Sequence, residues 1–205
     1  MPSPITHIVL ADKVFDKYFS DKDRKAFFVG TSFPDIRYYD NLDREKTHQD
    51  GLNIERIGKE SSFLAGMHFH AFVDEKWGDF YQWLEEHPFY IEPHQVSVVA
   101  LKFFEDERLY GRFKEWEQIA EFFDGVLDEE KKFEIAEKDI LRWHGFLRQY
   151  FIKKPNDQTR RPILMDAGLN SDFADQVNLF IEQMRGDKRI IEAIDDFYDK
   201  FESLL

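Results

Sequence analysis

The chain has 205 residues, no cysteine and a formal net charge of −13 at pH 7. The lack of cysteine excludes disulfides, thiolate metal sites and cysteine nucleophiles, so a metal ion would need histidine, carboxylate or backbone oxygen ligands. The acidic charge argues against stable binding of nucleic acid, although a bound divalent cation would still attract a single phosphate locally.

Length and hydropathy predict one soluble domain over residues 1–205. Apolar residues make up 42% of the chain and charged residues 34%, which is the usual balance of a globular protein. No apolar run approaches the length of a transmembrane segment, and the first residues do not resemble a signal peptide. We therefore expect a cytoplasmic protein. The sequence gives no indication of its oligomeric state.

Apolar residues recur at helical spacing along most of the chain, and no run of strands is recognisable. A first helix is expected to start at Ser3 or Thr6 and to end near Phe19. The other predicted helices cover about 21–29, 54 or 62 to 77, 94–124, 128–152, 171–185 and 187–204.

Several segments are predicted to break these helices. Residues 36–53 are polar and indicate a long loop, and long ordered loops in compact domains are often functional. Gly78 is expected to interrupt a helix, and Arg160-Arg-Pro162 to lie in a connection. The prediction is an all-α, compact multi-helix single domain, with its motifs in 1–80 and a C-terminal helical extension over 153–205.

The most specific chemical signal is Gly66-Met-His-Phe-His70-Ala-Phe-Val-Asp74. His70 and Asp74 are four residues apart, so on a helix they share one face, with Cβ atoms about 5–6 Å apart. An imidazole and a carboxylate at this spacing can hold one metal ion without bending the backbone. A capped or salt-bridged surface pair is the common alternative, so this pair alone is weak evidence.

Three further residues are candidates for the same site. Asp35 follows Pro34 directly after a predicted helix end, His48 lies in the polar loop, and His7 is on the apolar side of the first helix. A histidine on an apolar face is usually a core residue with one hydrogen bond. The sharper hypothesis is that His7 points into a site shared with the other candidates.

Four motifs in this order resemble the bacterial zinc-dependent phospholipase C family, which is related to the S1/P1 type of zinc nuclease. They are Thr6-His7, Gly30-Thr-Ser-Phe-Pro34-Asp35, Thr47-His48 and Gly66-x-x-x-His70-x-x-x-Asp74. The resemblance is specific over about the first 80 residues. It implies an all-helical fold that holds a cluster of zinc ions, which activates water against a phosphodiester.

The resemblance also implies roles for single residues. Asp35, His48, His70 and Asp74 would form the ligand set of one zinc ion, and His7 would belong to a second site bridged by Asp74. Asp35 is the expected general base, if it is not held too firmly as a ligand. One or two Zn²⁺ ions are expected, while Mn²⁺ or Fe²⁺ would suit the same ligand types.

The chain departs from the family pattern at three points. Secreted members use a free N-terminal tryptophan as a ligand, whereas this chain begins with Met1. No histidine follows Asp74 in the segment 75–80. In place of a later His-x-x-x-Glu pair the chain has His144-Gly-Phe-Leu-Arg148. A third zinc ion is therefore not expected.

The remaining histidines and the arginines have open roles. His144 is interpreted either as a buried histidine with one partner or as an additional ligand. Arg148 is a possible contact to substrate phosphate, and so is Arg44 in the polar loop, although solvent exposure is the default for a loop arginine. His68 is expected to be structural. His87 and His94 are expected to be solvated or capping residues, with His94 also a candidate for the site.

The predicted function is a zinc-dependent phosphoric ester hydrolase that resembles phospholipase C, in which metal-activated water attacks a phosphodiester or a monoester. The substrate would be a small-molecule or lipid phosphoester, and the absence of an export signal favours a small soluble one. One alternative is a non-catalytic, metal-stabilised helical binding protein. Another is a helical interaction protein in which the histidines are scattered core and loop residues.

Overall fold

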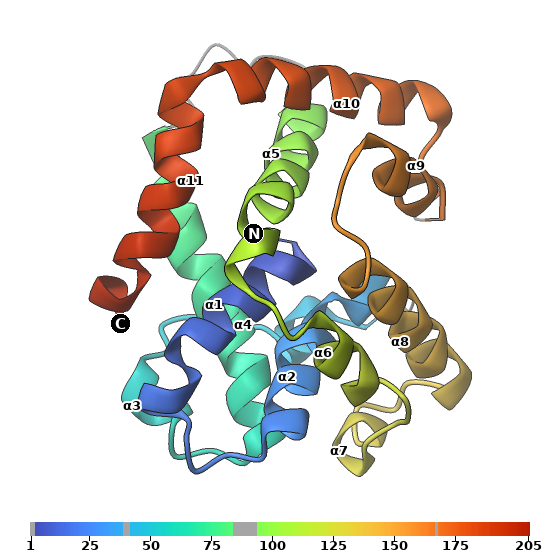
Figure 1. Ribbon diagram of the computed structural model, residues 1–205. Helices are drawn as coiled ribbons and strands as arrows, with labels where there is room; N and C mark the ends of the chain where they lie inside the picture. Colours follow the sequence, from blue (N-terminus) through green and yellow to red (C-terminus); the bar gives the residue numbers. More distant parts are fainter. Residues whose placement is uncertain (1–2, 39–41, 84–93, 167) are drawn as a thin grey trace.

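The computed structural model of the chain describes residues 3–38, 42–83, 94–166 and 168–205 (Figure 1). In these ranges every regular element is a helix and no strand is present, which confirms the predicted all-α fold. The α-helices are α1 (Pro4–Tyr18), α2 (Arg24–Ser32), α3 (Ile54–Ile57), α4 (Ser62–Tyr81), α5 (His94–Leu109), α6 (Trp116–Phe122), α7 (Asp128–Lys131), α8 (Glu137–Phe151), α9 (Asp157–Asp166), α10 (Ser171–Gly186) and α11 (Lys188–Lys200). The 3-10 helices are η1 (Phe33–Tyr38), η2 (Arg44–Lys46), η5 (Tyr110–Arg112) and η6 (Phe201–Leu204).

Helices α2 and α4 cross with their backbones in contact, because each has a glycine at the crossing. A Cβ atom on Gly30 would lie 2.1 Å from the carbonyl oxygen of Phe63, and one on Gly66 would lie 1.9 Å from that of Phe27. Any other residue would push the helices apart. Because Gly30 serves this contact, α2 continues to Ser32 instead of ending near residue 29 as predicted.

Phenylalanine side chains fill the space between α1, α2 and α4. The ring of Phe19 lies 4.6 Å from that of Phe27 and 5.7 Å from that of Phe69, between centroids, and the ring of Phe15 lies 5.2 Å from that of Phe27. All four side chains are buried. Aromatic rings in edge and tilted contact make a dense core, which fixes the three helices relative to one another.

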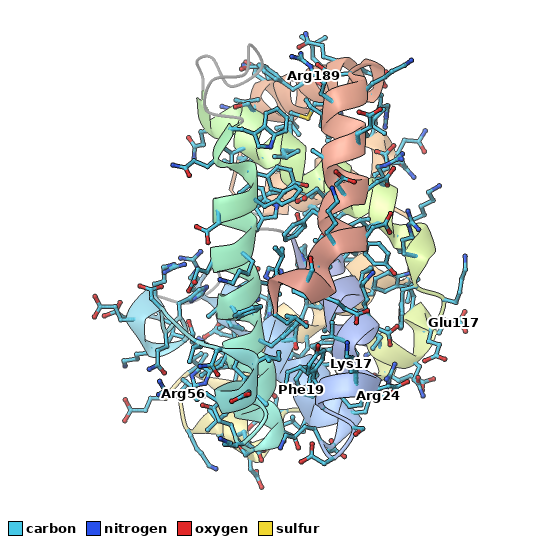
Figure 2. All side chains as sticks on the ribbon, turned by 90° about the vertical axis from the view of Figure 1, so that its left-hand side faces the viewer. Lys17, Phe19, Arg24, Arg56, Glu117 and Arg189 are labelled. Atoms are coloured by element: carbon cyan, nitrogen blue, oxygen red, sulfur yellow. The ribbon has the colours of Figure 1, made fainter. Side chains whose placement is uncertain are left out.

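The C-terminal helices pack back onto this core. Figure 2 shows α4 and α11 side by side, with aromatic side chains between them. Phe201 contacts Phe69 and Phe72 at centroid distances of 6.0 and 6.5 Å, and Phe197 contacts Phe80 at 5.1 Å. The predicted extension over 153–205 is therefore helical, and its last two elements cover one side of α4.

A cluster of charged side chains joins α5, α9 and α10. Arg160 is fully buried, and its guanidinium donates to Asn178 at 3.0 Å, to Glu107 at 3.4 Å and to Asp157. Arg185 donates to both carboxylate oxygens of Glu107 at 2.8 Å. The buried guanidinium of Arg160 therefore faces carboxylates and an amide oxygen, as a buried charge requires.

Two long predicted helices are each divided. The segment 94–124 turns at Tyr110, because the indole of Trp116 stacks on its ring at 4.8 Å and donates to its carbonyl oxygen at 3.1 Å. The segment 128–152 divides at Glu134, whose φ of 61° cannot continue a helix.

At two other positions the sequence predicts a break, but the helix continues. Helix α4 runs through Gly78, and α9 contains Pro162. Within the described ranges, none of the helices combines the length and apolar character that crossing a bilayer would need.

Candidate metal centre

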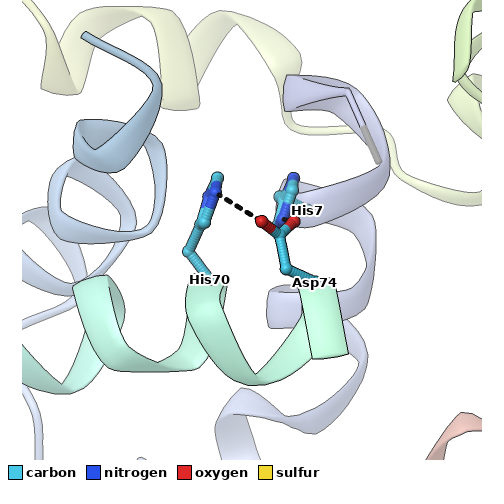
Figure 3. A group of neighbouring side chains, drawn as sticks. All are labelled: His7, His70 and Asp74. Carbon is cyan, nitrogen blue, oxygen red and sulfur yellow. Dashed lines mark ion pairs between the residues drawn. The ribbon is translucent and has the colours of Figure 1, made fainter. Parts of the chain in front are cut away.

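Five buried histidine and aspartate side chains from four parts of the chain meet in one place. His7 comes from α1, Asp35 from η1, His48 from the segment after η2, and His70 and Asp74 from α4. Their exposed fractions lie between 1% and 8%. Figure 3 shows His70 and Asp74 pointing from α4 to the same side, where His7 meets them from α1. These are the five residues that the sequence predicted to share a site.

The carboxylate of Asp74 is the centre of this group. Its Oδ1 lies 3.3 Å from Nε2 of His7, and its Oδ2 lies 3.3 Å from Nε2 of His48 and 3.8 Å from Nε2 of His70. Nε2 of His70 is also 4.0 Å from Oδ1 of Asp35. The rings of His7 and His70 are stacked, with centroids 3.8 Å apart and planes 1° from parallel.

Each of the three imidazoles is oriented through its Nδ1 atom. Nδ1 of His7 lies 3.2 Å from the carbonyl oxygen of Ser3, and Nδ1 of His70 lies 2.9 Å from that of Thr31. A carbonyl oxygen can only accept, so both Nδ1 atoms must carry the proton.

The same tautomer follows for the third imidazole. Nδ1 of His48 lies 2.9 Å from Oγ1 of Thr47, whose hydroxyl donates to the carbonyl oxygen of Arg44. Because that hydroxyl proton is already used, Thr47 accepts from His48. With Nδ1 of each ring bonded in this way, Nε2 of all three rings faces the centre, which is the arrangement of metal-binding histidines.

The atoms that face the centre have no hydrogen-bond partners among the described residues. These buried atoms are Nε2 of His7, His48 and His70, Oδ1 of Asp35, and both carboxylate oxygens of Asp74. A buried polar atom without a partner costs about 1–3 kcal/mol, and more when it is charged. Six such atoms around the carboxylate of Asp74 indicate that something else satisfies them.

The charge states fit a cation at this point. Burial lowers the pKa of His70 well below its usual value, so this imidazole is neutral at pH 7. Burial raises the pKa of Asp35. Burial acts in the same direction on Asp74, but the imidazoles of His70, His48 and His7 outweigh it and hold the pKa of Asp74 well below the usual range. The centre therefore combines the carboxylate of Asp74 with the neutral imidazole of His70.

The distances between these atoms also resemble those between the ligands of a metal ion. Two ligands of a tetrahedral zinc ion, each about 2.0–2.1 Å from the metal, lie about 3.3 Å from each other. That is the separation of Asp74 from both His7 and His48. The buried atoms of His7, His70 and Asp74 all lie within 4.8 Å of one another. This cluster is able to hold a metal ion, and its ligand types suit zinc as well as other divalent transition metals.

Cationic side chains lie beside the two carboxylates. A guanidinium nitrogen of Arg44 is 3.6 Å from Oδ2 of Asp74, and 46% of this arginine side chain is exposed. Lys102 on α5 and Arg37 on η1 lower the pKa of Asp35, against the larger effect of burial. Arg44 therefore lies where the centre approaches solvent. This position is compatible with the phosphate contact that the sequence analysis considers for it.

Two other predicted contacts are not part of this centre. Nε2 of His144 lies 2.8 Å from Oε1 of Glu130, and both side chains are buried. Of the two interpretations of His144, the structure agrees with a buried histidine that has one partner. Arg148 pairs with Asp124 at 2.9 Å on the surface. His68 pairs with Glu60 at 2.5 Å, which is a structural role.

The expectations for His87 and His94 fall on side chains outside the described part of the chain. Whether His94 joins the candidate centre therefore stays a prediction.

A residue that the sequence did not single out holds the helix that carries His7. Asp106 of α5 is fully buried and accepts hydrogen bonds from the backbone N–H of Thr6 at 2.8 Å, from its hydroxyl at 2.7 Å and from the N–H of Ile5 at 3.4 Å. Tyr150 of α8 donates to the same carboxylate at 2.6 Å. Since Ser3 makes no side-chain cap, Asp106 supplies the acceptor that the first turn of α1 needs.

No family model, curated protein or solved structure matches the chain.

Proposed function

We propose that this chain is a metal-dependent phosphoester hydrolase whose centre is formed by His7, Asp35, His48, His70 and Asp74. One observation carries the proposal: buried Nε2 and carboxylate oxygen atoms converge without hydrogen-bond partners, while every Nδ1 atom is engaged. Nothing among the described residues completes this site, and a divalent cation would do so. Zinc is the ion that we favour, because tetrahedral nitrogen and oxygen ligation is typical of it.

The proposed roles divide the ligands into two groups. His48, His70 and Asp74 would hold one ion together with Asp35, and His7 with the other oxygen of Asp74 would hold a second. A divalent cation bound there would supply Lewis acidity and lower the pKa of a coordinated water towards roughly 7.

Two residues at the edge of the centre would act on the substrate. Asp35 has an Oδ1 atom without a partner and a pKa raised by burial, which suits a carboxylate that accepts the proton of the attacking water. Arg44 is half exposed, and its guanidinium can donate two hydrogen bonds to a phosphate. Together they favour a phosphodiester or monoester, and we propose a small soluble ester in preference to a bulk lipid surface.

The test is hydrolysis by zinc-reconstituted protein of bis(4-nitrophenyl) phosphate, 4-nitrophenyl phosphate and phosphatidylcholine vesicles. We expect turnover of at least one soluble ester, abolished by EDTA and restored by Zn²⁺. Asp35→Asn should lower kcat at least about 100-fold, as loss of a general base does. His68→Gln is the matched control, because His68 bonds to Glu60 outside the centre, and it should retain full activity. Turnover of the vesicles alone would overturn the preference for a soluble substrate.

A second function is favoured by the number of donors. Five protein ligands can complete the coordination of one ion and leave no position for water, which is typical of structural zinc sites. The chain would then be a non-catalytic, metal-stabilised binding protein. Full zinc occupancy without turnover of any of the three esters would support this function and contradict the hydrolase.

A further inference from the structure

A groove lies between α8 and α9, apart from the candidate metal centre. Its volume is about 560 Å³, within the range of about 300–1,000 Å³ that is usual for small-molecule sites. Among the described residues, those that line it are Arg142, Gly145, Phe146, Gln149, Tyr150, Lys153, Gln158, Thr159, Pro162 and Ile163.

The charge of this lining differs from that of the rest of the chain. Of the 205 residues 41 are acidic, yet none of the ten lining residues is, and two of them, Arg142 and Lys153, are basic. Two other described hollows, lined by α6 and its neighbours, both contain Glu115 and Lys114 and so mix both signs. An anion would be attracted to the groove and repelled by most of the remaining surface.

One wall of the groove is a row of aromatic rings that is held in place from behind. Phe146 stacks on Tyr150 with centroids 5.7 Å apart and planes 13° from parallel, and on Trp143 at 5.3 Å and 17°. Both ends of the row are fixed, because Tyr150 donates to Asp106 at 2.6 Å and Trp143 donates to the carbonyl oxygen of Ser32 at 3.2 Å. A wall fixed in advance loses little conformational freedom on binding, which favours affinity.

The opposite wall offers both apolar surface and hydrogen-bonding groups. Pro162 and Ile163 of α9 supply apolar surface, and the side chains of Gln158 and Thr159 lie beside them. A flat apolar group would therefore find a partner surface on each side of the groove, and a negatively charged group would find the two cations.

From these features we infer that the groove between α8 and α9 binds a small organic anion with a flat apolar body, such as an aromatic carboxylate, sulfonate or phosphate. The two cations select the charge, and the rings of Phe146 and Tyr150 select the flat body. The inference is independent of the proposed hydrolase, because no residue of the metal centre lines the groove.

The test uses three probes that share one ring system and differ in charge: naphthalene-2-sulfonate, naphthalene-2-sulfonamide and 2-naphthylmethylammonium. We expect calorimetric titration to show saturable 1:1 binding of the sulfonate, about tenfold tighter than the neutral sulfonamide, with the ammonium weakest. The affinity should be the same with and without EDTA, which separates the groove from binding at a metal ion.

Variants locate the binding. Lys153→Gln and Arg142→Gln should each weaken the sulfonate about threefold, as loss of an exposed ion pair does. Phe146→Leu keeps an apolar side chain but removes the flat ring, and it should weaken all three probes. Lys114→Gln removes the same charge from another hollow and is the matched control, with unchanged affinity. Equal affinity for the three probes, no binding below about 5 mM, or loss of binding in EDTA would overturn the inference.

Discussion

Arg160 and Asp74 are both buried charged residues, but their surroundings differ in kind. Around Arg160, where α5 meets α9 and α10, the guanidinium is matched by Asn178, Glu107 and Asp157. Around Asp74, three imidazoles turn Nε2 atoms without hydrogen-bond partners towards a carboxylate that has no hydrogen-bond donor among the described residues. The first arrangement is complete within the protein and the second is not. The difference separates a structural cluster from a candidate binding centre, although both are buried and polar.

The largest expected effect is the response of the two regions to metal. If Zn²⁺ binds only the folded chain, a free concentration 1,000 times its Kd stabilises the protein by about 4 kcal/mol. For a chain of this length that raises Tm by roughly 8–16 °C, measured by differential scanning calorimetry with and without EDTA. His70→Ala should remove this rise, and Arg160→Met should keep it. If Zn²⁺ left the Tm unchanged, the cluster around Asp74 would have a structural role only, like the cluster around Arg160.

The second effect is the loss of stability when the complete cluster is broken. Arg160→Met removes the buried guanidinium from Asp157 and Glu107, which Arg185 still contacts, and we expect a loss of about 1–2 kcal/mol in the free energy of unfolding. The measurement is urea denaturation of the metal-free protein. Arg161→Met is the matched control, because Arg161 is exposed and pairs with Asp175 on the surface. It should change stability by about 0.5 kcal/mol or less. Equal losses of stability in both variants would show that the buried ion pairs stabilise the fold no more than a surface pair does.

The third effect is a pH dependence of the free energy of unfolding, and it comes from Glu105, which lies in neither cluster. Burial raises the pKa of Glu105 to about 7, against a hydrogen bond from the indole of Trp77. The folded state thus holds a proton that the unfolded state releases above a pKa of about 4.5, so this residue's contribution to stability falls as pH rises from about 4.5 to 7.

The variant Glu105→Gln tests that sign. In EDTA it should gain up to about 3 kcal/mol relative to the original chain between pH 5 and pH 8, from urea denaturation at each pH. A constant difference between the two proteins across this range would contradict the raised pKa.

The smallest expected effect concerns Asp106, which shares features with both regions. Asp106 is satisfied by four donors, like the structural cluster, yet it holds the first turn of α1 next to His7. Asp106→Asn should cost about 1–2 kcal/mol of stability. It should also weaken zinc about tenfold, as loss of a residue that orients a ligand does. Glu105→Gln, the neighbouring buried carboxyl, is the control and should leave zinc affinity unchanged. Lost stability with unchanged zinc affinity would limit Asp106 to a structural role.

The sequence predicted elements with strong local signals and failed where distant contacts decide. Helices that begin with a capping side chain, α10 after Asn170 and α11 after Asp187, start within one residue of the predicted positions. Helix α11 ends at Lys200, and the predicted stretch to residue 204 continues as the 3-10 helix η6. The end of α5 and the continuation through Pro162 depend on tertiary packing, which periodicity does not contain. The local spacing of His70 and Asp74 was enough to predict that they share a face.

The same distinction applies to the candidate centre. His7, Asp35 and His48 were grouped with His70 and Asp74 through motif order, and the structure brings their side chains together. The sequence allows two interpretations of His144, because its partner Glu130 lies in a different helix and no spacing rule connects them. Asp106 is 100 residues from Thr6 in the chain. Its role depends on where α5 crosses α1, so no local pattern indicates it.

The most direct test of the account is the metal content of the purified chain, measured by elemental mass spectrometry without added metal. We expect one to two equivalents of a divalent transition metal per chain, reduced by about one equivalent in both His70→Ala and Asp74→Ala and unchanged in His144→Ala. A metal-free protein that also fails to take up Zn²⁺, or variants that retain the full content, would contradict it.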